Sequence, residues 1–309
     1  MIQVLFSAPD SQWDDYNQRL PEACRAKGLD IELTRDLTAH DVEFIVYAPN
    51  AQMRDFSPYR QCRAVLSLWA GVERIVVNQT LTQPLVRLID PGLTQGMVEW
   101  VTGHVLRHHL GMDDHICRQD GIWSPVAPPL AAERRVTVLG LGALGAACAQ
   151  ALASLGFPVT GWSRTAKQLD GITCLSGLAT LPTALASAEI VVLLLPLTPE
   201  TTDLLDAALL ATLPKGAVII NPGRGPLIED DALLAALGSG HIGHATLDVF
   251  RTEPLPPDHP YWHHPRVTVT PHIASATRPA TAVQAIAQSM SEVLSGVSPA
   301  GLVDRTRGY

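Results

Sequence analysis

Length, composition and charge limit the class of protein before any motif is considered. The chain has 309 residues, of which 17% are charged and 47% hydrophobic, and its net charge is −8. Such a chain has room for two domains, each large enough to bury its own core. The acidic balance argues against a polyanion-binding surface, so we expect no nucleic-acid partner. No stretch reads as a membrane span or a secretory leader, which favours a cytoplasmic protein with no membrane partner.

Cysteine and histidine spacing gives no metal signature. The five cysteines are dispersed, without CxxC or a Cys/His cluster at zinc-ligand spacing, which fits a reducing cytoplasm and no metal. His104 and His108 lie four apart on one face of an expected helix, but no third ligand or HExxH accompanies them. We expect these two and His109 to face an interface or solvent. His263 and His264, in YWHHPR, are expected in surface or packing roles.

Strands and helices alternate along the chain. Buried strands are expected at residues 2–6, 44–47 and 64–68, and a long helix in residues 92–123 leads onward. Six more strands follow, at 136–139, 159–162, 190–195, 217–221, 245–248 and 267–270, which matches a doubly wound parallel sheet. An amphipathic helix at 281–296 is expected to return to the first unit. The pattern predicts an α/β protein with two Rossmann-like doubly wound domains: a discontinuous substrate domain over 1–95 plus 279–309, and a nucleotide-binding domain over 96–278.

A glycine-rich turn stands at the start of the second series, in VTVLGLGALG at residues 136–145. The GxGxxG motif lies between a β-rich segment and a helical one, which is the context of a dinucleotide site. Gly140 permits the tight turn, Gly142 lets a pyrophosphate approach the backbone, and Gly145 lets helix and strand pack closely. The phosphates would meet free amides at the helix N-terminus. The alternative is a glycine-rich turn without a ligand.

The end of the second strand in this series, GWSRTAK, indicates the cofactor. NAD sites place an acidic residue there to accept hydrogen bonds from the ribose hydroxyls. Here Ser163 and Arg164 offer a hydroxyl and a guanidinium to a 2′-phosphate. We therefore predict NADP(H), preferred over NAD(H). The alternative is that Arg164 is a solvated surface arginine.

Three residues that follow later strands carry the chemistry. Arg224 lies in NPGRGPLIEDDAL, Glu253 in LDVFRTEPLP and His272 in VTVTPHIAS. All three fall at carboxyl ends of strands, where open α/β sheets bind ligands. Reduction of a 2-keto acid by hydride transfer needs a proton donor, a fixed cation for the substrate and a group that keeps the donor protonated. His272, Arg224 and Glu253 suit these roles in turn.

At these residues the chain resembles the D-2-hydroxyacid dehydrogenase family, most closely its glyoxylate/hydroxypyruvate reductase A branch. The resemblance spans nearly the whole chain and is carried by LGLGALG, GWSRT, LLLPLTPETT, INPGRGPLIEDDALLAAL, ATLDVFRTEPLP, WHHPRVTVTPHIASATRPA and VDRTRGY. It implies Arg224 as the substrate-binding arginine, His272 as acid/base and Glu253 as its partner. The implied cofactor-binding residues are Gly140, Gly142, Ala143, Leu144, Gly145, Trp162, Ser163, Arg164, Leu195, Pro196, Pro222, Gly223, Asp248 and His272.

The resemblance also implies a homodimer, with residues 99–114 packing across the two-fold, and Asp248 near the nicotinamide carboxamide. In one respect the chain departs from the family. The usual GAG turn, whose amides grip the substrate carboxylate, is SLWAGVERI here, with Trp69 in place of the first glycine and Ala70 and Gly71 retained. We expect Trp69, Ala70 and Gly71 to bind substrate, with Trp69 favouring short keto acids.

The sequence leaves three functions open. The leading prediction is an NADPH-dependent reductase of small 2-keto acids such as glyoxylate and hydroxypyruvate, giving D-2-hydroxy acids. A non-catalytic dinucleotide sensor is the second, and the retention of Arg224, Glu253 and His272 argues against it. The third is a dehydrogenase of the same family with another substrate, such as 3-phosphoglycerate, formate or phosphite. The NADP-type GWSRT segment argues against phosphoglycerate.

Overall fold

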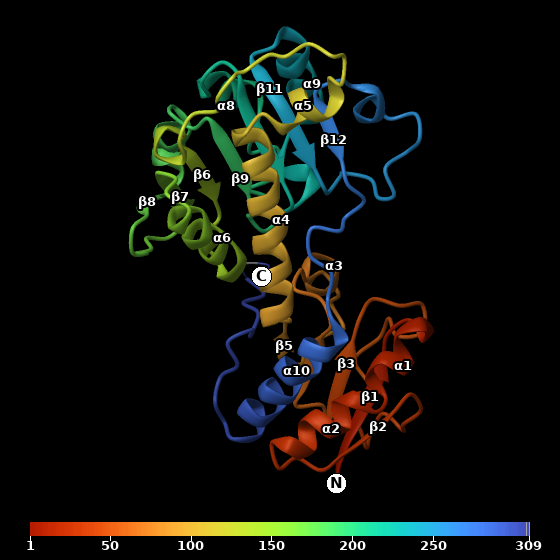
Figure 1. Cartoon of the computed structure of the whole chain (residues 1–309). Coiled ribbons are helices and arrows are strands. Elements are labelled where there is room, and N and C mark those ends of the chain that lie inside the picture. The colour runs from red at the N-terminus through yellow and green to blue at the C-terminus, as the bar shows by residue number, and fades with distance from the viewer. Residues whose placement is uncertain (307, 309) are drawn as a thin grey trace. The chain divides into compact units, whose positions relative to one another are not determined.

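The chain forms two α/β units in the computed structural model, which describes residues 1–306 and 308 (Figure 1). Residues 1–93 and 276–309 make up the first unit, and residues 94–275 the second. The first unit is discontinuous, and its inner boundaries lie two and three residues before positions 95 and 279, where the sequence placed them; the assignment of the two units as substrate and nucleotide-binding domains stays a prediction. Residues 307 and 309, which end the VDRTRGY stretch and the predicted substrate domain, lie outside the described residues.

The first unit is built on a parallel sheet with the strand order β2-β1-β3-β4-β5. Successive residues of β3 alternate between two cores, because side chains along a strand point to opposite faces. Phe44 and Val46 pack with helices α2 and α10, whereas Ile45 and Tyr47 pack on the other face. The elements of this unit are β1 (Ile2–Ser7), η1 (Asp10–Gln12), α1 (Trp13–Tyr16), α2 (Arg19–Ala26), β2 (Ile31–Thr34), β3 (Phe44–Tyr47), β4 (Ala64–Ser67), α3 (Glu73–Val76), β5 (Leu85–Val86) and α10 (Pro279–Leu294).

The second unit has a seven-stranded parallel sheet with the order β12-β11-β10-β9-β6-β7-β8. The chain runs outward from β6 to β8 and then returns to β9 on the other side of β6, which creates the topological switch point where such sheets bind ligands. Its strands are β6 (Val136–Leu139), β7 (Val159–Ser163), β8 (Thr173–Ser176), β9 (Ile190–Leu193), β10 (Ala217–Asn221), β11 (Ile242–Leu247) and β12 (Val267–Val269). Its helices are α5 (Met112–Cys117), η2 (Ala131–Glu133), α6 (Ala143–Ser154), η3 (Leu178–Thr180), α7 (Leu181–Leu185), α8 (Ala207–Thr212), η4 (Gly225–Leu227), α9 (Asp230–Ser239) and η5 (Pro260–His263).

Among the described residues, three strands were not predicted from the sequence. Two of them, β2 and β8, are edge strands, and their side chains are mostly exposed or half-buried, so they lack the continuous apolar run of the central strands. The third, β5, has only two residues. The predicted nine strands are all present, with bounds that differ by a few residues.

The predicted long helix is shorter than expected. Helix α4 (Pro91–His109) ends before Gly111, which adopts a left-handed φ of +62° that favours glycine and interrupts the helix. The separate helix α5 follows, and residues 118–130 form no helix or strand. Across the part of the chain that the structure describes, no helix combines the length and apolar character that a membrane span requires.

Candidate active site and dinucleotide-binding site

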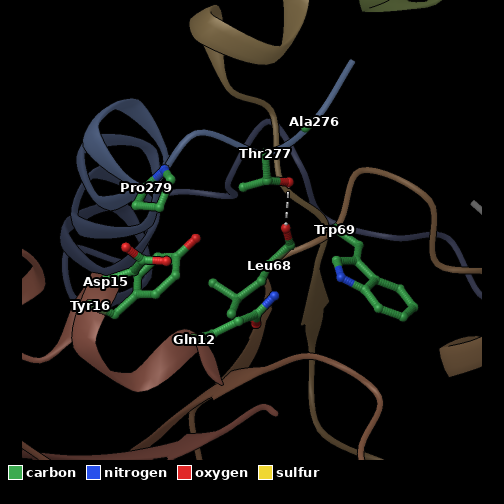
Figure 2. A pocket seen from close by; sticks show the side chains of 8 residues that line it. All are labelled: Gln12, Asp15, Tyr16, Leu68, Trp69, Ala276, Thr277 and Pro279. Carbon is green, nitrogen blue, oxygen red and sulfur yellow. Dashed lines mark hydrogen bonds between the residues drawn. The ribbon is translucent and has the colours of Figure 1, made fainter. Parts of the chain in front are cut away.

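The predicted substrate loop follows β4 in the first unit. Trp69 donates its amide to the hydroxyl of Ser67 (3.0 Å), and its carbonyl accepts from the amide of Leu88 (3.0 Å). Thr277 donates its hydroxyl to the carbonyl of Leu68 (3.0 Å; Figure 2). The indole of Trp69 is half-buried and packs against the core of the first unit. The same residue also lines a cavity. Ala70 and Gly71 come next, outside any helix or strand.

The glycine turn of the second unit has the geometry that the motif predicts. Gly140 has a φ of +105°, and a Cβ there would lie 2.5 Å from the carbonyl oxygen of Leu194. A Cβ on Gly145 would collide with the carbonyl oxygen of Gly140. Gly142 differs, because no atom lies within 4 Å of the place a Cβ would occupy. The fold itself therefore demands glycine at Gly140 and Gly145, whereas at Gly142 the missing side chain leaves open space at the start of α6.

Helix α6 begins at Ala143 without a side-chain cap, since its N-cap residue is Gly142. The first amides of the helix, including those of Ala143 and Leu144, have no partner within the helix. The positive end of the helix dipole adds to their attraction for an anion. The turn and the helix start thus provide a site that fits a pyrophosphate, and the switch point of the sheet lies next to it, because β6 and β9 are neighbours.

The end of β7 shows how the predicted phosphate-binding residues are held. Ser163 is buried, and its hydroxyl donates to the carbonyl of Thr165 (2.8 Å), so it stabilises the turn on which Arg164 stands exposed. Trp162 is only 2% exposed and donates its indole N–H to the carbonyl of Gly177 (3.1 Å). The Trp162 side chain therefore belongs to the core, which leaves only its backbone available to a cofactor.

One charged neighbour of Arg164 was missed by the sequence analysis. Glu200 lies in the loop after β9, and its pKa is lowered by hydrogen bonds to its own backbone and to Thr198, with a further contribution from the positive charge of Arg164. Arg164 is thus close enough to a carboxylate to feel its charge, although none follows it directly in sequence. Leu195 and Pro196, predicted to bind cofactor, precede this loop; Leu195 is buried, and Pro196 accepts a hydrogen bond from Thr201 (2.7 Å).

Arg224 stands on a tight turn after β10. Asn221, which is 1% exposed, accepts from the amide of Gly223 (3.1 Å) and donates to the carbonyl of Arg224 (3.0 Å). Pro222 and Gly223 are buried within this turn. A Cβ on the next residue, Gly225, would collide with the backbone of Phe250, so the turn packs directly on the segment that leads to Glu253.

His272 and Glu253 form the pair that the sequence predicted. The Nδ1 atom of His272 lies 2.7 Å from Oε2 of Glu253, and the amide of Phe250 donates to Oε1 of the same carboxylate (2.9 Å). Both side chains are accessible, since 52% of the His272 side chain and 35% of the Glu253 side chain are exposed. With Nδ1 facing the carboxylate, Nε2 of His272 is left to exchange a proton with a ligand.

Asp248 holds the backbone that carries His272. Its carboxylate is fully buried and accepts from the hydroxyl of Thr270 (2.6 Å) and from the amides of Ile273 (2.9 Å) and Ala274 (2.9 Å). His272 itself has a left-handed φ of +55°, and its amide donates to the carbonyl of Asp248 (2.9 Å). The structure thus shows Asp248 as the anchor of this turn, a role the sequence analysis did not foresee; its position near a nicotinamide stays a prediction.

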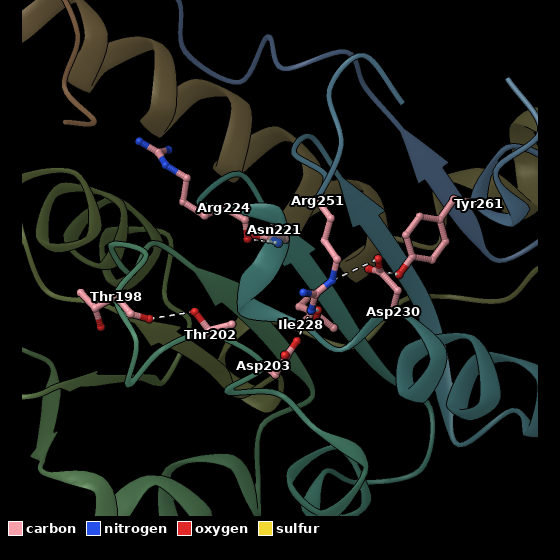
Figure 3. A network of polar contacts seen from close by, with 9 residues as sticks. All are labelled: Thr198, Thr202, Asp203, Asn221, Arg224, Ile228, Asp230, Arg251 and Tyr261. Carbon is pink, nitrogen blue, oxygen red and sulfur yellow. Dashed lines mark hydrogen bonds and ion pairs between the residues drawn. The ribbon is translucent and has the colours of Figure 1, made fainter. Parts of the chain in front are cut away.

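A polar network around Arg251 joins the two loops that bear Arg224 and Glu253 (Figure 3). Arg251 donates to Asp203 and to the carbonyl of Ile228 (2.7 Å), and its Nε lies 3.3 Å from Asp230. Tyr261 donates its hydroxyl to the same Asp230 (2.9 Å). The network was invisible in the sequence, because its members come from four separate segments of the second unit.

One histidine of α4 is not placed as predicted. His108 is half-buried and lies 2.9 Å from the hydroxyl of Thr246, and His109 is 5% exposed and packs its ring against Phe157. The expectation of an interface or solvent-facing role is therefore wrong for His109, whose ring is buried within its own unit, whereas for the half-buried His108 it stays a prediction. Among the described residues, no group of three or more His, Cys, Asp or Glu side chains could hold a metal ion. His263 is exposed and His264 half-buried.

The doubly wound sheets, the glycine turn and the acid–base pair define an α/β oxidoreductase that uses a dinucleotide. Residues 102–274 match the family described as "D-isomer specific 2-hydroxyacid dehydrogenase, NAD binding domain". The chain is also 41% identical over 257 residues to the glyoxylate/hydroxypyruvate reductase A of Yersinia enterocolitica, a match that covers 81% of this chain and 82% of that relative. The chain belongs to the D-isomer specific 2-hydroxyacid dehydrogenase family.

Two solved structures agree with this assignment. A D-isomer specific 2-hydroxyacid dehydrogenase from Xanthobacter autotrophicus, in complex with NADPH and MES, is 42% identical with a TM-score of 0.92, covering 100% of this chain and 99% of that one. An NADPH-dependent glyoxylate/hydroxypyruvate reductase from Sinorhizobium meliloti, in complex with NADP and sulfate, is 31% identical with a TM-score of 0.85, covering 100% of both chains.

Proposed function

We propose that this chain is an NADPH-dependent reductase of small 2-keto acids, with glyoxylate and hydroxypyruvate as substrates and D-2-hydroxy acids as products. The observation that carries the proposal is the His272–Glu253 pair, 2.7 Å apart, at the carboxyl ends of β11 and β12. A protein that only sensed a dinucleotide would need neither an accessible imidazole nor a carboxylate that orients it. The proposal also agrees with the activity for which the Yersinia and Sinorhizobium relatives are named.

The residues present fit an NADP(H) molecule. The open space at Gly142 and the uncapped start of α6 suit the pyrophosphate, with Gly140, Ala143, Leu144 and Gly145 forming the turn. Ser163 holds the turn that presents Arg164, whose guanidinium would pair with the 2′-phosphate. Both solved relatives carry NADPH or NADP. When bound, the cofactor supplies the hydride.

His272 donates a proton from Nε2 to the carbonyl oxygen of the substrate as that oxygen gains negative charge. Glu253 holds the imidazole in one orientation through Nδ1 and stabilises the protonated ring. Arg224 offers a fixed positive charge to the substrate carboxylate or carbonyl, and the amides of Ala70 and Gly71 bind the carboxylate. Each role follows the resemblance to the family.

The test is the oxidation of NADPH and of NADH, followed at 340 nm, with glyoxylate, hydroxypyruvate, pyruvate and a branched 2-keto acid. We expect turnover with NADPH and the two short substrates, and much lower kcat/KM with NADH. Binding of NADPH without turnover of any keto acid would support the sensing function instead. In a separate assay, efficient reduction of NAD⁺ or NADP⁺ by 3-phosphoglycerate, formate or phosphite would assign the chain to another branch of the family.

The proposal includes a homodimer. In residues 112–130, which we call the arm, six large apolar side chains are exposed: Met112, Ile116, Ile122, Trp123, Val126 and Leu130. Trp123 is 93% exposed, and this many exposed large apolar side chains in one segment favour a protein contact. The arm directly follows α4, which the resemblance to the family implies at a two-fold axis, so the occupant that fits it is a second copy of this chain. The five free cysteines suit a cytoplasmic location.

A further inference from the structure

A cavity of about 300 Å³ lies within the first unit beside the proposed substrate loop. Figure 2 shows the eight side chains that line it, from the segment after β1, the end of β4 and the start of α10. Because β1 and β4 are parallel, both segments leave the sheet at its carboxyl edge, where open α/β sheets bind ligands. The lining residues are Gln12, Asp15, Tyr16, Leu68, Trp69, Ala276, Thr277 and Pro279.

The cavity adjoins the point where the substrate carboxylate would be held. Leu68 and Trp69 line it, and Ala70 and Gly71 follow directly in the chain. A keto acid anchored on these two amides would therefore be held by the residues that directly follow the cavity lining in the chain. The volume is roughly ten times the 30 Å³ that a water molecule occupies in the liquid, which leaves room for a substituent of several heavy atoms. The Trp69 side chain therefore forms part of the cavity wall and does not fill the cavity.

The polar groups that line the cavity are neutral or acidic. Gln12 contributes a carboxamide, Tyr16 and Thr277 contribute hydroxyls, and Asp15 contributes a carboxylate. No lysine, arginine or histidine is among the eight lining residues. Arg19 contacts Asp15 from outside this set, at 3.5 Å, and both side chains are about half exposed.

A second carboxylate lies behind the lining. Asp90 is 1% exposed and accepts hydrogen bonds from the amides of Gly92 and Leu93 and from the hydroxyl of Thr281. Burial raises the pKa of Tyr16 to about 12, with contributions from the charges of Asp15 and Asp90. Tyr16 therefore keeps its proton and can donate a hydrogen bond at neutral pH, while the two carboxylates make the cavity unfavourable for an anion.

We infer that this cavity is the subsite for the substituent on carbon 3 of the keto acid and that Asp15 restricts it to uncharged, hydroxyl-bearing groups. The inference rests on the proposed function. Hydroxyl groups find a donor in Tyr16 and acceptors in Asp15 and Gln12, whereas a phosphate or second carboxylate meets the negative potential of Asp15 and Asp90. Hydroxypyruvate fits the subsite, and its 3-phosphate ester does not.

The experiment compares hydroxypyruvate with 3-phosphohydroxypyruvate, which differ only in the phosphate group, and uses glyoxylate as the reference without a carbon 3. The readout is kcat/KM for each substrate with NADPH, relative to glyoxylate. In Asp15→Asn the relative value for the ester should rise about fivefold, the effect of one exposed charge pair. Asp14→Asn is the matched control, because Asp14 is the exposed neighbour that does not line the cavity, and it should leave the ratio unchanged.

Ionic strength gives a second measurement on the unmodified protein. Salt screens the repulsion between the phosphate of the ester and the exposed carboxylate of Asp15. Raising the salt concentration from about 0.05 M to 0.5 M should therefore increase kcat/KM for the ester relative to that for hydroxypyruvate. The subsite is overturned if the unmodified protein reduces the ester as well as hydroxypyruvate, or if Asp15→Asn and Asp14→Asn have the same effect. Failure to reduce glyoxylate would overturn the proposed function and the subsite together.

Discussion

At the scale of single residues, His272 is the one on which the proposed chemistry depends most directly. Replacing it with alanine should lower kcat with glyoxylate by about 10² to 10⁴, the usual contribution of a general acid. NADPH binding should survive, because the turn at residues 140–145 that fits the pyrophosphate lies elsewhere in the sheet. Turnover and equilibrium fluorescence titration of NADPH check the two parts, and near-normal kcat would remove His272 from the mechanism.

Arg251 is a positioning residue, because it ties the segment before Glu253 to Asp203, Ile228 and Asp230. We expect Arg251→Gln to lower kcat by about ten- to a hundredfold, since small displacements of catalytic groups are costly. The pH dependence of kcat that arises from the His272–Glu253 pair should also shift along the pH axis. Arg25→Gln, an exposed arginine of the first unit, is the control. Reduced stability with an unchanged pH profile would show a purely structural role.

Arg164 should decide the choice of cofactor. Arg164→Ala removes a charge-assisted hydrogen bond to the 2′-phosphate, which is worth roughly one to two decades in affinity. The KM for NADPH should rise by that factor while the KM for NADH stays the same, because NADH has no 2′-phosphate. Steady-state kinetics with both cofactors measure the difference. Equal losses for both would identify Arg164 as a surface arginine.

At the scale of elements, two half-buried histidines, His108 of α4 and His244 of β11, lie where α4 contacts the sheet of the second unit, with their ring centroids 4.8 Å apart. His108 lies 2.9 Å from Thr246, and His244 lies 2.9 Å from Thr268. Burial and neighbouring positive charge lower the pKa of His108 to about 3 and that of His244 to about 4. The other charged groups close to them are Arg107, Asp113, His104 and His264, and Asp113 acts in the opposite direction.

Stability should therefore fall in acid. Above pH 6.5 both histidines are neutral in the folded and unfolded states, so the full stability is present. Between about pH 6.5 and pH 4 only the unfolded chain takes up the protons, and each histidine removes up to about 1.4 kcal/mol of unfolding free energy per pH unit. Urea unfolding across this range should show a flatter profile for the double variant His108→Gln/His244→Gln. The exposed His263→Gln is the control, and an unchanged slope in the double variant would contradict the assignment.

At the scale of the whole molecule, the exposed arm should control assembly. Trp123→Ser combined with Ile122→Ser removes the two most exposed large apolar side chains of the arm. We expect the unmodified chain to sediment as a dimer and the double variant to dissociate at micromolar concentration. Light scattering after size-exclusion chromatography measures both, and Leu178→Ser, an exposed apolar residue outside the arm, is the control. A monomeric unmodified chain would refute the homodimer.

The sequence alone determined the features that depend on local pattern. Apolar runs identified the buried central strands. GxGxxG between a strand and a helix identified the turn, because Gly140 adopts a left-handed φ and Gly145 lies against the carbonyl of Gly140, five residues earlier. The pairing of His272 with Glu253 was also foreseen, since both follow neighbouring parallel strands and so meet at one edge.

Tertiary structure decided what depends on segments far apart in the chain. The edge strands β2 and β8 are strands because neighbours pair with them, and polar side chains are tolerated there. Asp248 became the anchor of the His272 turn, and His108 became a neighbour of Thr246 in the sheet, because packing supplied partners that sequence spacing does not reveal. The Arg251 network and the cavity beside Trp69 arise in the same way. Periodicity and motifs carry information about the local structure of the segment in which a residue lies. Its hydrogen-bond partners, its burial and its electrostatic neighbours are set only when segments far apart in the chain pack together.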